Sequence, residues 1–428
     1  MQEEDIYHWW QYYGRSGKTV YSRGRRLSVE SCGTLNTARG PDFISARFIL
    51  DGITYQGDVE CHLKSSDWYA HQHHLDKAFR HVVLHLVASP VHRSPVKSKW
   101  CAQEICTFVL PEPANNYPFP ARTCKPLKAY ETKLTGSLMR LSLERFEQKT
   151  RLFLKLLTVE NYQALFYVNY FRALGYPANA NSFQLLAERL SWSRLFANIH
   201  PERLSSRDIF AVFAGQAGFI PFKPADEYSR LAGLKYREYG HLLPGVPFED
   251  SMWQIAGIRP LNHPHFRLAA GLHLLKHHNF SLFDKINQAL QMRRQFSVVM
   301  PAIMNIFNIS PEPYWSDHYA LGKRHKNFSA RVCIGKARLT ELLINVILPL
   351  AAARAVFSGS DGYYAYLQSL YLALPLVSTY GMLNRRMPWV KQCRNAMPVQ
   401  AVNQALLTLQ SGFCSVSLCD QCPINRTQ

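Results

Sequence analysis

Asp42 and Glu60 are the two residues of this sequence whose type and position best suit chemistry. Residues 43–50 and 53–63 are rich in β-branched and aromatic side chains, and an Asp-Gly pair separates them. Two such runs around an Asp-Gly pair predict a β-hairpin. Asp42 is then expected at the mouth of the first strand and Glu60 inside the second. Two carboxylates placed in this way suit a hard divalent cation such as Mg²⁺.

The second strand of this hairpin carries a row of ionisable residues. Because alternate residues of a strand share a face, we expect Asp58, Glu60, His62 and Lys64 to project to one side. Burying such a row without a partner would cost free energy, so one interpretation is that these residues surround a metal ion. The alternative is an edge ribbon whose polar face meets water. The sequence leaves both interpretations open.

A run of histidines follows the hairpin. Asp67 stands at a predicted helix start, and His71, His73, His74 and Asp76 come directly after it. Histidines within four positions of one another could bind a metal or act as a base. Histidines that are solvated, or hydrogen-bonded inside a core, are the more frequent case. The run is therefore a second candidate ligand set.

Three cysteines near the end of the sequence, Cys414, Cys419 and Cys422, have a spacing that suits metal ligands. The short gap between the last two lets both thiolates reach one tetrahedral centre. Cys124 is the first candidate for a fourth ligand, and Cys393 is the rival. In a cytoplasmic protein the thiols are expected to be reduced, so the expected occupant is zinc or an iron–sulfur cluster. The alternative is a tail of unligated thiols.

A basic, proline-bracketed loop at residues 259–267 leads into a predicted helix. Arg259, Asn262 and Arg267 belong to this segment, and Arg267 falls in the first turn of the helix. Basic side chains beside a helix N-terminus could hold a phosphate of a nucleic acid. The alternative is a rigid loop whose charges are solvated.

These candidate residues need a scaffold, and the hydrophobic periodicity predicts an α+β chain. Residues 1–112 are expected to form a small mixed β-sheet domain. The Pro-rich segment 113–126 is the predicted boundary. Beyond it, residues 127–412 predict a large all-α domain, and residues 413–428 a short Cys-rich tail.

The first domain is expected to begin with a helix and to contain strands on either side of the hairpin. These elements are predicted at residues 3–13, 20–29, 82–87 and 104–110. The main helices of the second domain are predicted at residues 138–157, 162–174, 183–195, 208–213, 266–276, 282–291, 339–348, 363–374 and 402–410.

Length, composition and charge limit the class of protein. Of the 428 residues, 47% are apolar and 13% aromatic, which is enough for two or three folded domains and excludes disorder. The formal net charge of +19 indicates a polyanionic partner, and nucleic acid is the one we expect. The N-terminus does not resemble a signal peptide, and the apolar run 342–357 is interrupted and too short to span a bilayer. We therefore expect a cytoplasmic protein without membrane association.

Several ordered motifs make the chain resemble a bacterial family, domain of unknown function 2851, over nearly its whole length. Two positions depart from the family's tendency, with Gln72 in place of Gly and Cys61 in place of an aliphatic residue. Neither departure touches the acidic pair. Besides the cysteine tail, the segments that carry the resemblance are residues 40–43, 57–62, 65–68, 71–73, 213–219, 259–264 and 345–349.

The acidic pair also resembles the PD-(D/E)XK nuclease pattern, an Asp after a proline followed by a Glu on the next strand. The resemblance implies a restriction-endonuclease-like fold, a small mixed sheet flanked by helices. It implies Mg²⁺ bound by Asp42, Glu60 and the carbonyl of Cys61, with a helical acid such as Glu4 as an outer ligand. Some nucleases of this superfamily are also held together by a metal cluster with one upstream and three C-terminal cysteines.

His62 stands where the PD-(D/E)XK pattern has its lysine. A histidine can take a proton from water, and Lys64 on the same strand face could supply the missing cation. The expected function is therefore Mg²⁺-assisted hydrolysis of a phosphodiester. One alternative is a non-catalytic nucleic-acid-binding protein that kept the fold and lost the lysine. Another is a hydrolase of a different substrate whose metal is held by His71, His73 and Asp76.

Overall fold

The computed structural model describes most of the chain, and the described residues form two compact units. The first, here the N-terminal unit, takes its residues from Met1–Ser137, Gly381–Val390 and Leu406–Gln428, and the second, the helical unit, from Leu138–Tyr380 and Lys391–Ala405. The predicted boundary 113–126 lies outside the described residues, which are 3–36, 40–90, 96–111, 131–157, 161–176, 178–326, 328–377, 379–387, 389–414 and 421–424.

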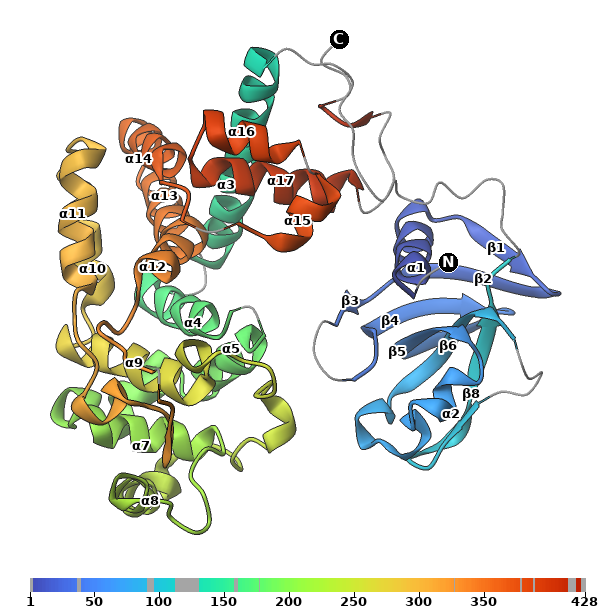
Figure 1. Ribbon diagram of the computed structural model, residues 1–428, viewed down its shortest axis with the longest axis horizontal. Helices are drawn as coiled ribbons and strands as arrows, with labels where there is room; N and C mark the ends of the chain where they lie inside the picture. Colours follow the sequence, from blue (N-terminus) through green and yellow to red (C-terminus); the bar gives the residue numbers. More distant parts are fainter. Residues whose placement is uncertain are drawn as a thin grey trace. The chain divides into compact units, whose positions relative to one another are not determined.

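The N-terminal unit is built on a mixed sheet whose strands lie in the order β1-β2-β4-β5-β6-β8-β7, with β3 paired to the edge of β4 (Figure 1). Strands β1 to β5 pair antiparallel, whereas β6 pairs parallel with both β5 and β8. The strand bounds are β1 (Thr19–Ser22), β2 (Arg25–Ser31), β3 (Thr34–Leu35), β4 (Phe43–Leu50), β5 (Ile53–Lys64), β6 (Val82–Ser89), β7 (Val96–Ser98) and β8 (Cys101–Val109).

The predicted hairpin is present as β4 and β5. Asp51 and Gly52 join the two strands, and their φ angles of 53° and 87° are both left-handed, as a two-residue hairpin turn requires. The parallel connection from β5 to β6 contains the short helix α2 (Asp67–Ala70) and two 3-10 turns, His73–Leu75 and Lys77–Phe79. A mixed sheet followed by helices confirms the α+β class.

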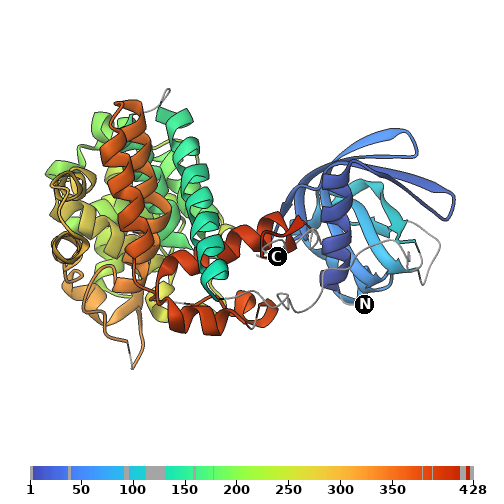
Figure 2. The same ribbon diagram turned by 90° about the horizontal axis from the view of Figure 1, so that it is seen from above.

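Both faces of the sheet are covered. Helix α1 (Glu3–Ser16) lies along one face of the sheet (Figure 2). Trp9 and Trp10 of this helix belong to the same buried cluster as Phe43 and Phe48. On the other face, Trp68 and Phe79 from the β5–β6 connection pack with Val82, Val96 and Ile105. The polar face of β5 is therefore not an edge open to water, and residues 59–62 of this strand are all buried.

A β-bulge sets the register of the hairpin at its open end. Phe43 pairs with Val59 and Ala46 with Gly57, so three steps along β4 correspond to two along β5. Ser45 carries the distortion, with a φ of 58° that is uncommon for a residue with a side chain. Because of this extra residue, Asp42 at the mouth of β4 is brought beside Glu60.

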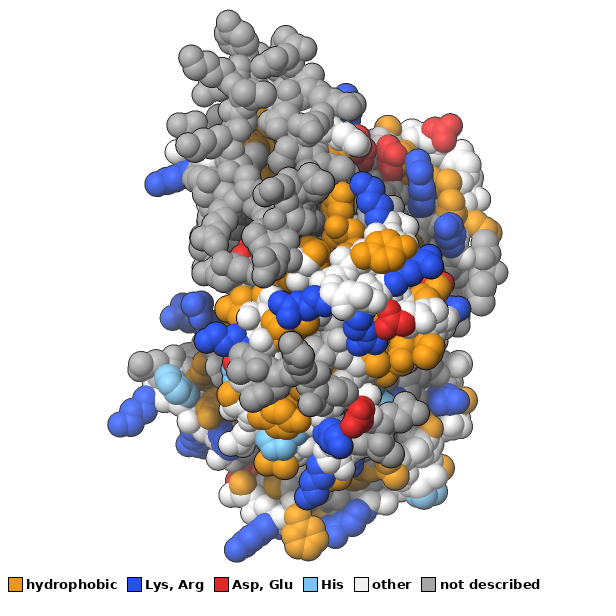
Figure 3. Space-filling view, turned by 90° about the vertical axis from the view of Figure 1, so that its right-hand side faces the viewer, with side chains coloured by type: hydrophobic (Ala, Val, Ile, Leu, Met, Phe, Trp, Pro, Cys, Tyr) orange, Lys and Arg blue, Asp and Glu red, His pale blue; other side chains and the backbone are white. Residues whose placement is uncertain are grey.

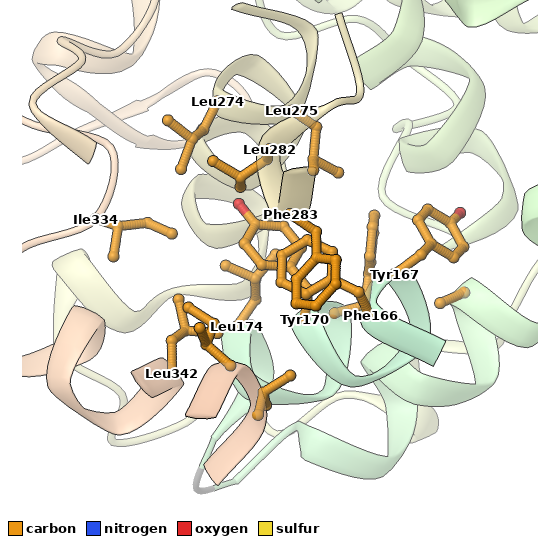
Figure 4. Packing of buried hydrophobic residues seen from close by; sticks show 14 of the residues in the cluster. Phe166, Tyr167, Tyr170, Leu174, Leu274, Leu275, Leu282, Phe283, Ile334 and Leu342 are labelled. Carbon is orange, nitrogen blue, oxygen red and sulfur yellow. The ribbon is translucent and has the colours of Figure 1, made fainter. Parts of the chain in front are cut away.

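The rest of the chain is mainly helical, around a large apolar core in the helical unit. Phe166, Tyr170 and Leu174 of α4 meet Leu274 of α9 and Phe283 of α10 in this core (Figure 4). The helices are α3 (Glu131–Leu157), α4 (Tyr162–Gly175), α5 (Ala180–Arg189), α6 (Trp192–Arg194), α7 (Ser206–Gln216), α8 (Glu227–Tyr239), α9 (Pro264–His277), α10 (Leu282–Gln291), α11 (Phe296–Phe307), α12 (Lys336–Leu342), α13 (Leu348–Phe357), α14 (Asp361–Ala373), α15 (Gly381–Arg386), α16 (Val390–Ala396) and α17 (Gln400–Gly412).

Two details differ from the sequence-based expectation. The second domain is not all-α, because β9 (His318–Ala320) and β10 (Lys323–Arg324) form a small ribbon. The apolar run 342–357 is also not broken by its proline. It belongs to a 22-residue helical stretch, Lys336–Phe357, that is long and apolar enough to cross a membrane. However, 78% of the most apolar 18-residue part of this stretch is buried inside the protein. Pro349 has no backbone N–H to donate, and a π-helical turn, Leu343–Ile347, lies directly before the helix that contains it.

Candidate metal centre

Asp42, the residue directly before β4, is held in place by two hydrogen bonds. The hydroxyl of Tyr7, from α1, donates a hydrogen bond to Asp42 Oδ1 at 2.5 Å. The backbone N–H of Cys61 donates to Asp42 Oδ2 at 2.9 Å. Both oxygens therefore have a fixed position, one set by the helix and one by strand β5.

Glu60 lies next to Asp42 and links it to the histidines. Glu60 Oε2 accepts a hydrogen bond from the backbone N–H of Asp42 at 3.0 Å. Glu60 Oε1 lies 3.2 Å from His73 Nε2 and 3.5 Å from His62 Nε2. The residue is only 5% exposed. One oxygen of this carboxylate thus fixes the acidic pair, and the other faces two imidazoles.

Both carboxyl groups resist ionisation where they lie. Burial, and then the neighbouring charge of Glu60, raise the pKa of Asp42 to about 7, although its hydrogen bonds from Tyr7 and Cys61 act in the opposite direction. Burial raises the pKa of Glu60 to about 8, again opposed by the hydrogen bond from Asp42. A buried and a half-buried acid with raised pKa values are typical of a functional site. A bound cation would favour the ionised form of both.

The imidazoles of His62, His71 and His73 converge beside Glu60. One nitrogen from each lies within 4.8 Å of the others. His62 is central, with Nε2 at 3.2 Å from His71 Nδ1 and Nδ1 at 2.8 Å from His85 Nε2. Burial and the neighbouring imidazoles lower the pKa of His62 to about 2. His62 is therefore neutral at ordinary pH, which is the state that binds metals.

The donor set fits a divalent transition metal. Three imidazole nitrogens and one carboxylate oxygen suit Zn²⁺, Mn²⁺ or Fe²⁺, whereas Mg²⁺ prefers oxygen ligands and bound water. Of the residues expected from the sequence, the structure brings together Asp42, Glu60, His62, His71 and His73. It thereby joins the acidic pair and the histidine run, which the sequence presents as separate ligand sets.

Lys64 and Asp67 do not point into this centre. Lys64 is exposed, and its backbone N–H donates to Asp67 Oδ2 at 3.0 Å, so Asp67 stabilises the turn after β5. Glu4 is exposed on α1, and it is Glu3 whose charge contributes to the raised pKa values of Asp42 and Glu60.

Asp58 and Asp76 have local backbone partners. Asp58 Oδ1 accepts a hydrogen bond from the N–H of Ser45 at 3.0 Å and so supports the bulge of β4. Asp76 Oδ1 accepts from the N–H of Ala78 at 2.9 Å and caps the second 3-10 turn, and its charge acts on His73 from outside the cluster. Neither belongs to the group of converging ligand atoms.

Sequence reasoning missed two residues of this centre, Tyr7 and His85. His85 is fully buried on β6, and burial lowers its pKa to about 3. His85 could have been found from the sequence, because it is the one polar residue in the apolar run 82–87. A polar residue inside a buried strand needs a hydrogen-bonding partner and therefore indicates a polar neighbour. Tyr7 gave no comparable signal, since aromatic residues fill one side of α1.

The basic loop has a different geometry from the expected one. Arg259 is exposed, but Arg267 is only 8% exposed and donates to Asn262 Oδ1 at 2.7 Å. Arg338 also approaches this oxygen, at 3.4 Å. Arg267 thus stabilises the loop from inside, and within this segment Arg259 is the arginine that a surface phosphate could reach.

The expected cysteine cluster falls largely on residues that the structure does not describe. Cys124 and Cys419 lie outside the described residues, whereas Cys414 and Cys422 lie inside them. A zinc or iron–sulfur site at these thiols stays a prediction from the sequence.

Comparison with known protein families gives a match over most of the chain. Residues 3–117 and 121–376 match a family model described as protein of unknown function (DUF2851). No curated protein and no solved structure matches the chain significantly.

Proposed function

We propose that this chain, which belongs to the DUF2851 family, is a metal-dependent hydrolase that cleaves phosphodiester bonds of nucleic acid. One observation carries the proposal: Glu60 Oε1 lies within 3.5 Å of two neutral imidazoles, while its other oxygen is bonded to the backbone of Asp42. A buried glutamate and a buried imidazole that converge with the half-buried His73 and the exposed His71 are the surroundings expected of a divalent metal that solvent can reach.

The order of the site residues along the chain supports nuclease-type chemistry. Asp42 precedes the first strand of an antiparallel hairpin, Glu60 lies in the second strand, and a parallel strand follows. This order agrees with the PD-(D/E)XK pattern, and a restriction-endonuclease-like fold for the N-terminal unit is part of the proposal. The net charge of +19 favours a polyanionic substrate over a neutral one.

The residues that would hold the metal are Glu60, His62, His71 and His73. When bound there, a divalent metal would supply Lewis acidity and lower the pKa of a bound water. Asp42 is the candidate general base, because it lies beside Glu60 and a cation bound there would keep its carboxylate ionised and able to take a proton. Its contacts with Tyr7 and the backbone of Cys61 hold the carboxylate in one orientation. Mg²⁺ in the acidic pair remains the alternative occupant.

The test begins with chelator-treated protein titrated with Mn²⁺, Zn²⁺ and Mg²⁺ by calorimetry. The titrated protein is then tested for cleavage of labelled single- and double-stranded DNA and RNA. We expect one transition metal to bind and to restore cleavage. Glu60→Gln should lower metal affinity at least roughly tenfold and abolish cleavage, because it removes the one anionic ligand of the set.

Glu104→Gln is the matched control, since Glu104 is an exposed glutamate of β8 paired with Lys97. It should leave metal binding and cleavage unchanged. Metal binding without cleavage of any of the four substrates would favour a hydrolase of another substrate. Nucleic-acid binding that needs no metal would indicate a binding module, and the absence of metal binding would refute the centre itself.

A further inference from the structure

The helical unit contains a cavity of about 280 Å³ that is separate from the residues of the metal centre. It lies where the ends of α10 and α13 meet the beginning of α14. Its lining includes Arg293, Arg354, Ser358, Ser360 and Tyr363. The volume is near the lower end of the roughly 300–1,000 Å³ typical of small-molecule sites, so it suits a small group.

Two guanidinium groups give the cavity its charge. The guanidinium carbon of Arg293 lies 5.3 Å from the ring centre of Tyr363, and that of Arg354 lies 4.6 Å from the ring centre of Tyr162. Among the described residues, neither arginine forms an ion pair with a carboxylate. Stacking on a ring face leaves the N–H groups at the guanidinium edge free for an anion.

Two serines in the loop before α14 add hydroxyl groups to the lining. The hydroxyls of Ser358 and Ser360 lie 3.3 Å apart. The Ser358 hydroxyl also donates to the carbonyl of Ala355 at 3.2 Å. The side chain of Ser360, at the N-cap of α14, does not cap the helix, so its hydroxyl can turn toward a ligand.

Tyr363 forms the aromatic wall of the cavity and supports Arg293 with its ring. The residue is 7% exposed, and its hydroxyl is buried with no hydrogen-bond partner in the described part of the chain. Burial raises the pKa of Tyr363 to about 12, so the hydroxyl stays a donor at ordinary pH.

We propose that this cavity binds a phosphate group, held by Arg293, Arg354 and the hydroxyls of Ser358 and Ser360. Arginine edges and hydroxyls are donors that phosphate oxygens accept from. The phosphate could come from a small phosphate monoester or from the phosphorylated end of a nucleic acid strand. The site does not depend on the metal centre.

The test uses full-length, chelator-treated protein, so that no metal can bind the probe. Inorganic phosphate is titrated by calorimetry at low ionic strength into the parent, Arg354→Gln, Arg293→Gln and Tyr363→Phe. Each arginine variant should weaken binding roughly tenfold or more, because each removes a hydrogen bond to a charged group. Tyr363→Phe keeps the ring on which Arg293 stacks, so it should bind phosphate like the parent, and it should melt no lower because it deletes a hydroxyl that has no partner in the described part of the chain.

Arg331→Gln is the control, since Arg331 is an exposed arginine of the same unit and does not line the cavity. It should bind phosphate like the parent. No phosphate binding, or an equal loss in Arg331→Gln and Arg354→Gln, would overturn the proposal. Given a positive result, adenosine 5′-monophosphate and a 5′-phosphorylated oligonucleotide are compared with an unphosphorylated oligonucleotide. Tighter binding of adenosine 5′-monophosphate would identify a small phosphate monoester as the ligand. Tighter binding of the 5′-phosphorylated oligonucleotide would identify the phosphorylated end of a nucleic acid strand.

Discussion

His85 controls which ring nitrogen of His62 can face Glu60. Its Nε2 lies 2.8 Å from His62 Nδ1, so one proton is shared between the two rings. A metal at His62 Nε2 requires that proton to sit on His62 Nδ1 and be donated to His85. Among the described residues, His85 Nδ1 has no partner, so the contact with His62 is the main polar constraint on the His85 ring.

Replacing His85 should therefore weaken metal binding without touching a ligand. We expect His85→Phe to lower transition-metal affinity about 10- to 100-fold, the range for partners of metal-bound histidines. His85→Gln should recover part of this loss, because its amide oxygen can accept the His62 proton. Calorimetric affinity and the melting temperature of the metal-free protein are measured together. Unchanged metal affinity in both variants would make His85 only a core residue.

At the scale of elements, the hairpin could be predicted because its signals are local. The Asp-Gly turn and the two apolar runs fix β4 and β5, and the structure has them at Phe43–Leu50 and Ile53–Lys64. The bulge at Ser45 could not be predicted, since nothing in a serine indicates a left-handed φ. It is imposed by pairing, including the hydrogen bond from its N–H to Asp58.

The candidate site was partly predictable for the same reason. Asp42 and Glu60 could be inferred from strand position, but their meeting with His71 and His73 depends on how the β5–β6 connection folds back over the sheet. The inward direction of Arg267 likewise depends on Asn262, whose amide oxygen it binds at 2.7 Å. Contacts between distant segments decide both features, and sequence periodicity does not report them.

The bulge gives a test of the element that positions the acidic pair. Ser45→Val should disfavour the left-handed φ of Ser45, because a β-branched residue rarely adopts it. If β4 then pairs regularly from Ala46 and Gly57 onward, Asp42 comes to lie opposite Cys61 instead of Glu60, and metal affinity should fall. Ser45→Gly is the matched control, since glycine adopts the same φ without strain. It should keep metal affinity and melt at or above the parent temperature. If Ser45→Val folds and binds metal like the parent, the bulge does not position the site.

At the scale of the whole molecule, the positive charge can be followed on the face drawn in Figure 3, where it is dispersed. Lys and Arg side chains are spread over the face drawn in Figure 3, between hydrophobic side chains, and do not gather in a single stripe. A dispersed charge favours binding of a polyanion through many weak phosphate contacts rather than one deep groove. The net charge of +19 then acts mainly on affinity and on the rate of encounter.

Salt dependence is the direct measure of this effect. We expect affinity for a nucleic acid oligonucleotide to fall steeply as salt rises, and Arg259→Gln to lower the slope of log affinity against log salt by about one unit. Arg259 is exposed, so a phosphate can reach it. Arg230→Gln is the control, because Arg230 already pairs with Glu227 at 2.7 Å and should release little further charge. Fluorescence anisotropy over a series of salt concentrations gives both slopes. Equal slopes for the two variants would exclude Arg259 as a phosphate contact. If the affinity does not change with salt concentration, the surplus positive charge serves solubility or a protein partner instead.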